Sequence, residues 1–144
     1  MATTATLTLA STDIAGDPVS VSKVATLTKA GSTNELDQST GLNRVHLRST
    51  SEKVLLTANA EGNDLAAKVY IINKSDDASL YLTVKINAQT TGKLYGGDFM
   101  FIPWSQTDTS ASIKVAASNW TSSTGDIPVA YALFHEDTDF STNA

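Results

Sequence analysis

The sequence predicts an all-β protein, a two-sheet antiparallel β-sandwich or jelly roll of about eight strands. Short runs of alternating apolar and polar residues recur along the 144-residue chain, and alternation with a period of two is typical of a strand with one buried face. Each run is bounded by Gly, Asn, Asp, Ser or Thr, which favour turns. No stretch shows sustained helical periodicity, so we expect almost no helix.

Two strands are predicted close to the N-terminus. Residues 4–10 (TATLTLA) alternate, and the Ser, Thr, Asp and Gly-Asp-Pro residues after them predict a turn. Residues 19–29 (VSVSKVATLTK) form a second run, in which the alternation changes phase at Lys23 and Val24. Such a change indicates a β-bulge. Residues 30–43 are polar and are predicted to form a loop.

The middle of the chain carries four predicted strands. Residues 44–48 (RVHLR) alternate, and residues 53–58 (KVLLTA) form a shorter and more apolar run. Residues 68–73 (KVYIIN) and 80–86 (LYLTVKI) are rich in β-branched and aromatic residues, as strands are. The KSDDAS segment between these two runs predicts a hairpin loop.

The segment 93–104 (KLYGGDFMFIPW) joins a turn signal to the densest apolar run in the chain. We expect Gly96 and Gly97 to adopt positive φ in the turn. Phe99 and Phe101 are two residues apart and share one face of the predicted strand, which we assign to the core. Truncating Phe101 to alanine is then expected to cost about 3–5 kcal/mol.

Three runs complete the predicted set of strands: residues 99–104, 111–117 (ASIKVAA) and 129–135 (VAYALFH). Pro103 lacks a backbone N–H, so it indicates a strand end or a sheet edge. The apolar residues on the alternating faces form the predicted core: Leu7, Leu9, Val45, Leu47, Leu55, Val69, Ile71, Leu82, Val84, Phe99, Phe101, Ile113, Val115, Ala130, Ala132 and Phe134.

The composition excludes several kinds of partner and chemistry. A net charge of −5 and the lack of a Lys/Arg stripe exclude nucleic acid as a direct partner. The chain has no Cys, which excludes disulfides, thiol catalysis and cysteine–zinc sites and favours synthesis in a reducing cytosol. The N-terminus lacks the features of a signal peptide, and no run matches the roughly 18 apolar residues of a transmembrane helix, so no membrane contact is predicted.

No catalytic or cofactor motif is present in the sequence, such as a Gly-x-Ser-x-Gly elbow, a phosphate-binding Gly loop or a dinucleotide fingerprint. His46 and His135 have no second ligand at metal-binding spacing and are interpreted as structural. The acidic residues 135–140 lack the Gly turn of a calcium loop and are interpreted as a solvated end. Asn73 and Asn119 begin glycosylation sequons, which we attribute to chance. We predict no enzyme activity, no cofactor and no metal.

Trp120 lies in a polar setting (SNWTS) that suggests an exposed position. Three interpretations remain open. Its ring can close over the core, it can anchor a subunit interface, where Trp is enriched, or it can form part of a platform on which a glycan stacks.

The C-terminal half carries, in this order, KVYIINKSDDASLYLTVKI, KLYGGDFMFIPW, SIKVAAS and VAYALFHED. From residue 68 to residue 137 this order resembles a class of small β-sandwich virion proteins of tailed bacteriophages. The resemblance implies a particle building block that works by assembly, without a reaction. It implies a capsid decoration (cement) protein that bridges capsid subunits, with a tail or head–tail component, or a carbohydrate- or receptor-binding module of the virion, as alternatives.

The partners that the resemblance implies are other copies of the chain, in a homo-oligomer such as a trimer, and the major capsid protein or other virion proteins. The implied location is the virion, after synthesis in the host cytoplasm. We predict one domain over residues 1–144, with an N-terminal arm (1–16) and a C-terminal tail (136–144). A strand at a free chain end can add to a sheet edge of another chain. The candidate interface residues are Thr4, Thr6, Thr8, Trp104, Trp120 and Phe140.

Overall fold

The computed structural model of the chain describes residues 3–14, 17–27, 38–39, 41–57, 66–105 and 111–135. These residues form β-strands and no helix, which confirms the predicted all-β class. The strands are β1 (Thr4–Ile14), β2 (Asp17–Thr26), β3 (Gln38–Ser39), β4 (Asn43–Leu47), β5 (Lys53–Thr57), β6 (Ala66–Asn73), β7 (Tyr81–Ile86), β8 (Gln89–Tyr95), β9 (Phe99–Ser105), β10 (Ser112–Ala116) and β11 (Ile127–His135).

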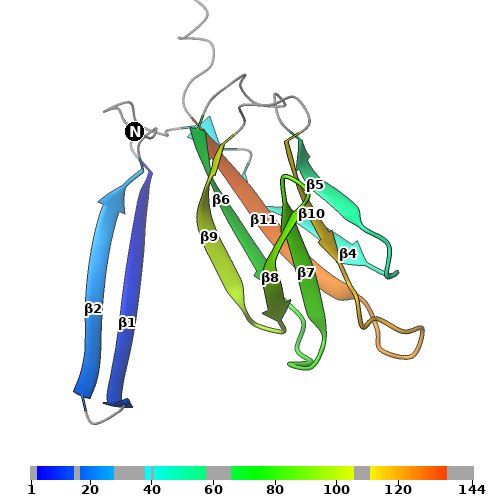
Figure 1. The fold of residues 1–144 in the computed structure, drawn as a ribbon, viewed down its shortest axis with the longest axis horizontal. Coiled ribbons are helices and arrows are strands. Elements are labelled where there is room, and N and C mark those ends of the chain that lie inside the picture. Colours follow the sequence, from blue (N-terminus) through cyan, green and yellow to red (C-terminus); the bar gives the residue numbers. More distant parts are fainter. Residues whose placement is uncertain are drawn as a thin grey trace, which may run out of the picture.

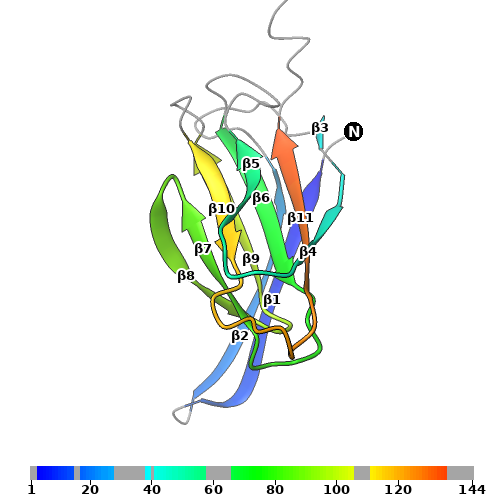
Figure 2. The ribbon, with the colours of Figure 1, turned by 90° about the vertical axis from the view of Figure 1, so that its right-hand side faces the viewer.

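The strands from β3 to β11 form a sandwich of two antiparallel sheets, which we call the body (Figures 1 and 2). One sheet, the β11 sheet, has the order β4–β11–β6–β9, with the short β3 on the same side of β11 as β4. The other, the β10 sheet, has the order β5–β10–β7–β8. From β4 onwards each strand crosses to the opposite sheet, except that β7 and β8 stay together. This is the connectivity of an eight-stranded jelly roll.

The core lies between the two sheets and is built from alternating residues. Val69 and Ile71 of β6 and Val129 of β11 face Leu82 of β7 and Ile113 of β10, and all five are fully buried. Each contributes roughly 1.5–3 kcal/mol on burial. The predicted core residues that join this cluster, fully or in part, are Val45, Leu47, Leu55, Val69, Ile71, Leu82, Val84, Ile113 and Val115.

Strand β9 has the opposite phase to the one predicted. Trp104 is 2% exposed and belongs to the core, so period-two alternation places Phe99 and Phe101 on the outer face. They are 59% and 38% exposed, and their assignment to the core is wrong. Both faces of this strand are apolar, and the largest side chain, the indole of Trp104, occupies the interior. Phe134 is likewise only half-buried, in contact with Phe101.

The first two strands form a hairpin of their own, β1–β2, and pair with no other described strand. Leu7 and Leu9 are 45% and 49% exposed on it, so their assignment to the core is also wrong. β1 continues through the predicted turn to Ile14, and the register shifts between Ser11 and Ile14 instead of near Val24. Because the hairpin has no deeply buried face, Val24 can stay exposed without a bulge to correct its phase.

The connections between strands differ from the prediction. β6 and β7 lie in different sheets, so the predicted KSDDAS hairpin is an arch between the sheets. The hairpin within the body is β7–β8, whose turn residues Asn87 and Ala88 have φ of 51° and 69°, values typical of a two-residue hairpin turn. β8 was not predicted because its residues are mostly polar and exposed. β9 pairs with β6 alone among the described strands, so Pro103 lies on an edge strand, as predicted.

Asn73, at the end of β6, ties the two sheets together. Its side chain is fully buried, and Nδ2 donates to the backbone oxygens of Leu80 (3.1 Å) and Leu94 (2.9 Å). Its Oδ1 accepts from the backbone N–H of Ser75 at 2.9 Å. All the bonds of this amide are therefore made inside the fold, and Asn73 of the first sequon has a structural role.

The two glycines before β9 serve different purposes. Gly97 has a φ of 93°, as predicted, whereas Gly96 does not have a positive φ and is required by crowding. A Cβ at Gly96 would lie 2.4 Å from the backbone oxygen of Asp77 and 2.8 Å from that of Ser75. The β6–β7 arch and the β8–β9 connection, which also crosses between the sheets, therefore come into backbone contact at Gly96.

Replacing Gly96 by alanine is expected to lower the free energy of unfolding by about 1–3 kcal/mol, because backbone must shift to admit the methyl group. Gly92→Ala is the matched control, since nothing lies within 4 Å of a Cβ there. The measurement is the urea midpoint of each purified variant. Equal midpoints for the two variants would show that the arches tolerate the added atom.

Candidate functional site

The β1–β2 hairpin has two chemically different faces, because directly opposed residues of a strand pair share a face. The register pairs Ala5 with Ala25, Leu7 with Lys23 and Leu9 with Val21. We call these six residues the apolar face of the hairpin. The opposite face is mostly hydroxyl-bearing, and its members are Thr4, Thr6, Thr8, Ala10, Ser20, Ser22, Val24 and Thr26.

The outer face of the β11 sheet, on the side of β9 and β6, is aromatic. Tyr70 of β6 and Phe99 of β9 have ring centroids 6.4 Å apart, and the rings of Phe101 and Phe134 are 6.3 Å apart. We call these four residues the aromatic face. Tilted rings at such separations attract one another, so the four side chains form two pre-arranged pairs from three neighbouring strands.

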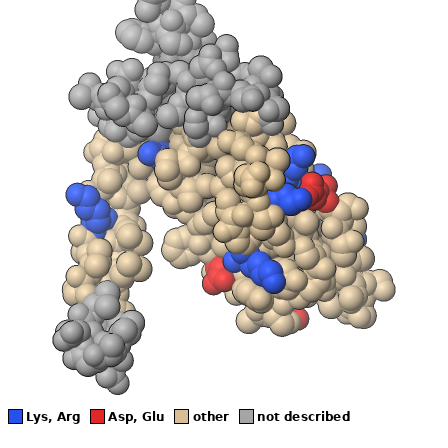
Figure 3. Space-filling view, viewed as in Figure 1, with Lys and Arg blue, Asp and Glu red and all other residues tan. Residues whose placement is uncertain are grey.

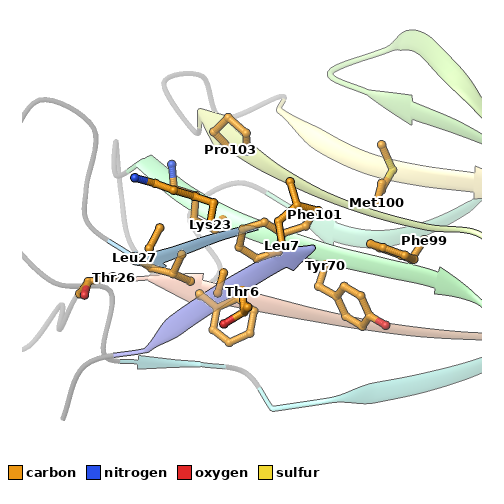
Figure 4. A pocket seen from close by; sticks show the side chains of 14 residues that line it. Thr6, Leu7, Lys23, Thr26, Leu27, Tyr70, Phe99, Met100, Phe101 and Pro103 are labelled. Carbon is orange, nitrogen blue, oxygen red and sulfur yellow. The ribbon is translucent and has the colours of Figure 1, made fainter. Parts of the chain in front are cut away.

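The apolar face of the hairpin and the aromatic face line opposite sides of a groove of about 690 Å³ (Figure 4). In the space-filling view the hairpin adjoins the body at one end and is separated from it by open space towards the other (Figure 3). The charged side chains in the lining are Lys23 from the hairpin and Lys68 from β6, and the lining includes no carboxylate or amide side chain. The groove is therefore apolar with a cationic contribution from each wall.

The predicted interface residues fall in different environments. Thr4, Thr6 and Thr8 are exposed on the hydroxyl face of the hairpin. Trp104 is not a surface residue: it is buried in the core, and its Nε1 donates to Asn87 Oδ1 at 3.1 Å. Its place in the candidate interface is therefore corrected, because the indole fills the space between the sheets. Phe140 lies outside the described residues.

Trp120 is partly buried and packs against the core cluster, and its Nε1 is buried without a hydrogen-bond partner. This placement supports the interpretation of Trp120 as a lid over the core. The neighbouring Asn119 of the second sequon donates to the backbone oxygen of Ser79 at 2.7 Å and accepts from the N–H of Tyr81 at 3.1 Å. Its amide therefore holds the start of β7.

Sequence reasoning missed the aromatic face because it placed Phe99 and Phe101 inside. A usable signal was present: the run from Phe99 to Ile102 is apolar at every position, so both faces of this strand carry side chains that gain from being covered. Such a run predicts a further layer that covers the outer face of β9. In the structure the groove and the hairpin lie over this outer face.

Ion pairs and shifted carboxyl groups lie away from the groove. Glu52 pairs with Lys85 on the outside of the β10 sheet, and the hydrogen bond and charge of Lys85 lower the pKa of Glu52. The pKa of Asp77 is lowered because its carboxylate accepts hydrogen bonds from the Ser79 hydroxyl at 2.6 Å and backbone N–H at 2.9 Å. Glu52 and Lys85 line a smaller cavity of about 200 Å³ on the outside of the β10 sheet, together with Lys114, Thr83 and Ser118.

Histidine and acidic side chains form no group of three or more that could hold a metal ion within the described ranges. His46 is exposed on β4, and His135 is buried at the end of β11. The described residues include no helix that is long and apolar enough to cross a membrane.

Comparison of the chain with models of known protein families and with curated proteins gives no match.

Proposed function

We propose that this chain is a structural protein of a virus particle, a capsid decoration (cement) protein that joins neighbouring subunits of the shell by non-covalent contacts. Its partners are other copies of itself and the major capsid protein, and it carries out no reaction. The resemblance of residues 68–137 to small phage virion proteins supports the class. The jelly-roll connectivity is compatible with it, since viral capsid domains are among the proteins that use this fold, although a fold alone does not define a function.

The observation that carries the proposal is a hairpin that stands off the body with an exposed apolar face. An isolated two-stranded hairpin is only marginally stable in water, and exposed apolar patches mark contact surfaces. Leu7, Leu9 and Val21 are exposed in the single chain, and a neighbouring subunit that covers them would remove this apolar area from water. An arm of this kind lets a small body reach across a subunit boundary, and many copies on one shell add avidity to a modest single contact.

A carbohydrate- or receptor-binding module of the virion is the second candidate, and the exposed rings beside a groove are what favours it. Aromatic rings can stack on sugars, but sugar hydroxyls also need placed hydrogen-bond partners. The polar side chains of the groove lining are only hydroxyl and ammonium groups, with no carboxylate or amide to bond sugar hydroxyls. The sugar-binding candidate therefore ranks below the structural one. A tail or head–tail component would use the same contacts as a decoration protein.

The test is removal of residues 1–27, the whole hairpin. We expect the remaining body to stay folded, because no described body strand pairs with β1 or β2. We expect its affinity for particles that lack the protein to fall at least about tenfold, which corresponds to a loss of about 1.4 kcal/mol. Co-sedimentation with such particles measures the affinity, and circular dichroism checks the fold.

Two point variants separate the faces of the hairpin. Leu7→Ser with Leu9→Ser should reproduce the loss of binding, whereas Thr4→Ser with Thr8→Ser, on the hydroxyl face and outside the groove lining, should not. If the truncated protein bound particles with wild-type affinity, the hairpin would be dispensable and the body alone would carry the contact. Finding the protein in the tail of purified particles, and absent from the head, would favour the tail alternative.

A further inference from the structure

We infer that the aromatic face is the acceptor for the hairpin of a second copy, so that neighbouring copies are linked by exchanged hairpins. The apolar face of one hairpin, with Leu7 at its centre, packs on Phe101 and its neighbours in the other chain. This inference deepens the proposed function and rests on it for the presence of neighbouring copies.

Two apolar faces remain uncovered in the single chain. Leu7 on the hairpin and Phe99 and Phe101 on β9 are all more than a third exposed, although they line one groove, and Leu9, on the same hairpin face beyond the groove, is similarly exposed. The hairpin does not close this groove on its own body. Because apolar area is exposed on both walls, covering either wall with another apolar surface lowers the free energy.

The hairpin also extends past its own groove. Ala5, Leu7 and Ala25 line the groove, but Leu9 and Val21, further along the same face, do not. The base of the hairpin is closed by the Leu27 N–H, which donates to the Thr3 oxygen at 2.9 Å, and Leu27 is buried and lines the groove. The half of the apolar face that carries Leu9 and Val21 is therefore positioned for contacts with another chain.

If two identical copies exchange hairpins, each apolar wall is covered by an apolar wall of the other copy, and no third surface is needed. In a twofold arrangement the hairpin of each chain covers the aromatic face of the other, so the two contacts are the same. Ten residues (28–37) join the end of the hairpin to β3. An extended segment of ten residues spans at most about 33–36 Å, which sets the greatest distance between an exchanged hairpin and its own body. Lys23, the charged residue on the apolar face, also suits this acceptor, because an ammonium group is attracted to aromatic ring faces.

Cysteine cross-linking tests the exchange in the full chain, which has no Cys of its own. A Leu7→Cys variant, labelled with ¹⁵N, is mixed with an unlabelled Phe101→Cys variant and oxidised gently. Mass spectrometry then identifies disulfides that join the two chains. The matched control replaces Leu7→Cys by Val24→Cys, which is exposed on the opposite face of the same hairpin.

The expected result is a mixed Leu7→Cys/Phe101→Cys disulfide in several-fold excess over the Val24→Cys control. Equal yields would show random collision and overturn the inference. A double variant carrying both cysteines in one chain tests the main alternative. If it gives only a disulfide within the chain, and the mixture gives none between chains, the hairpin closes over its own body and the exchange is wrong.

A second measurement keeps the inference testable if oxidation perturbs the hairpin. Sedimentation velocity of the wild type is expected to show self-association that Phe101→Ser weakens and Tyr95→Ser does not, since Tyr95 is similarly exposed but lies on β8. A wild type that stays monomeric at all accessible concentrations overturns the inference. Particle binding that depends on the hairpin, without any cross-link between copies, would leave the proposed function standing and remove the exchange alone.

Discussion

Replacing Asn73 by alanine is expected to lower the free energy of unfolding by about 3–5 kcal/mol. The substitution leaves the backbone oxygens of Leu80 and Leu94 and the N–H of Ser75 without their partner. Leu80 and Leu94 are themselves buried, so water cannot readily take the place of the amide. Each buried group left unsatisfied costs roughly 1–3 kcal/mol, and two such groups, together with the half-buried N–H of Ser75, share this one side chain.

Asn119→Ala is the matched control for this prediction. It also removes an amide that bridges two backbone groups, the Ser79 oxygen and the Tyr81 N–H. Asn119 is only half-buried, so solvent can compensate and a cost of about 1 kcal/mol is expected. Urea unfolding with an unchanged slope measures both variants. Equal costs would show that the buried amide does not couple the two sheets.

Replacing Trp104 by alanine is expected to cost about 3–5 kcal/mol, as for a large buried ring. Its indole lies in the core between the sheets, and its Nε1 donates to Asn87 in the β7–β8 turn. Trp104→Phe keeps most of the volume and should cost about 1 kcal/mol from the lost hydrogen bond and reduced packing.

Phe101→Ala on the same strand provides the contrast. Because this ring is on the outer face, truncating it should cost less than about 1 kcal/mol in a protein without its partner, as for most surface changes. Thermal or urea unfolding of the three variants gives the order directly. If Phe101→Ala proved as costly as Trp104→Ala, the phase of β9 would be the reverse of the one described.

The fold class was predictable because most strands have one apolar face. Val69 with Ile71, Leu82 with Val84, and Ile113 with Val115 alternate with less apolar residues, and a period-two pattern has only one inward arrangement. β9 was not predictable in the same way. Phe99, Met100, Phe101 and Ile102 are apolar on both faces, so the local pattern cannot say which face is inside.

The pairing of strands and the candidate site depend on contacts that are distant in sequence. The turn residues between β6 and β7 look like those of a hairpin, yet the two strands lie in different sheets, and the buried amide of Asn73 bonds across this arch to Leu80. Leu7 and Leu9 alternate as core residues do, but their strand pairs with β2 alone. The groove exists only where this hairpin and the outside of β9 come together, which no single segment encodes.

Strand order also governs how fast the molecule can reach its final form. Among the described strands of the body, β7 and β8 are the consecutive strands that pair with each other, so nearly every other pairing requires closure of a long loop first. Folding of such topologies takes milliseconds to seconds, whereas an isolated hairpin forms in roughly 1–10 μs. The β1–β2 hairpin can thus form while the face made by β6, β9 and β11 is still being assembled. In the proposed exchange, a contact that depends on this face has to wait until its own chain has folded, so an unfolded chain cannot yet accept the hairpin of another copy.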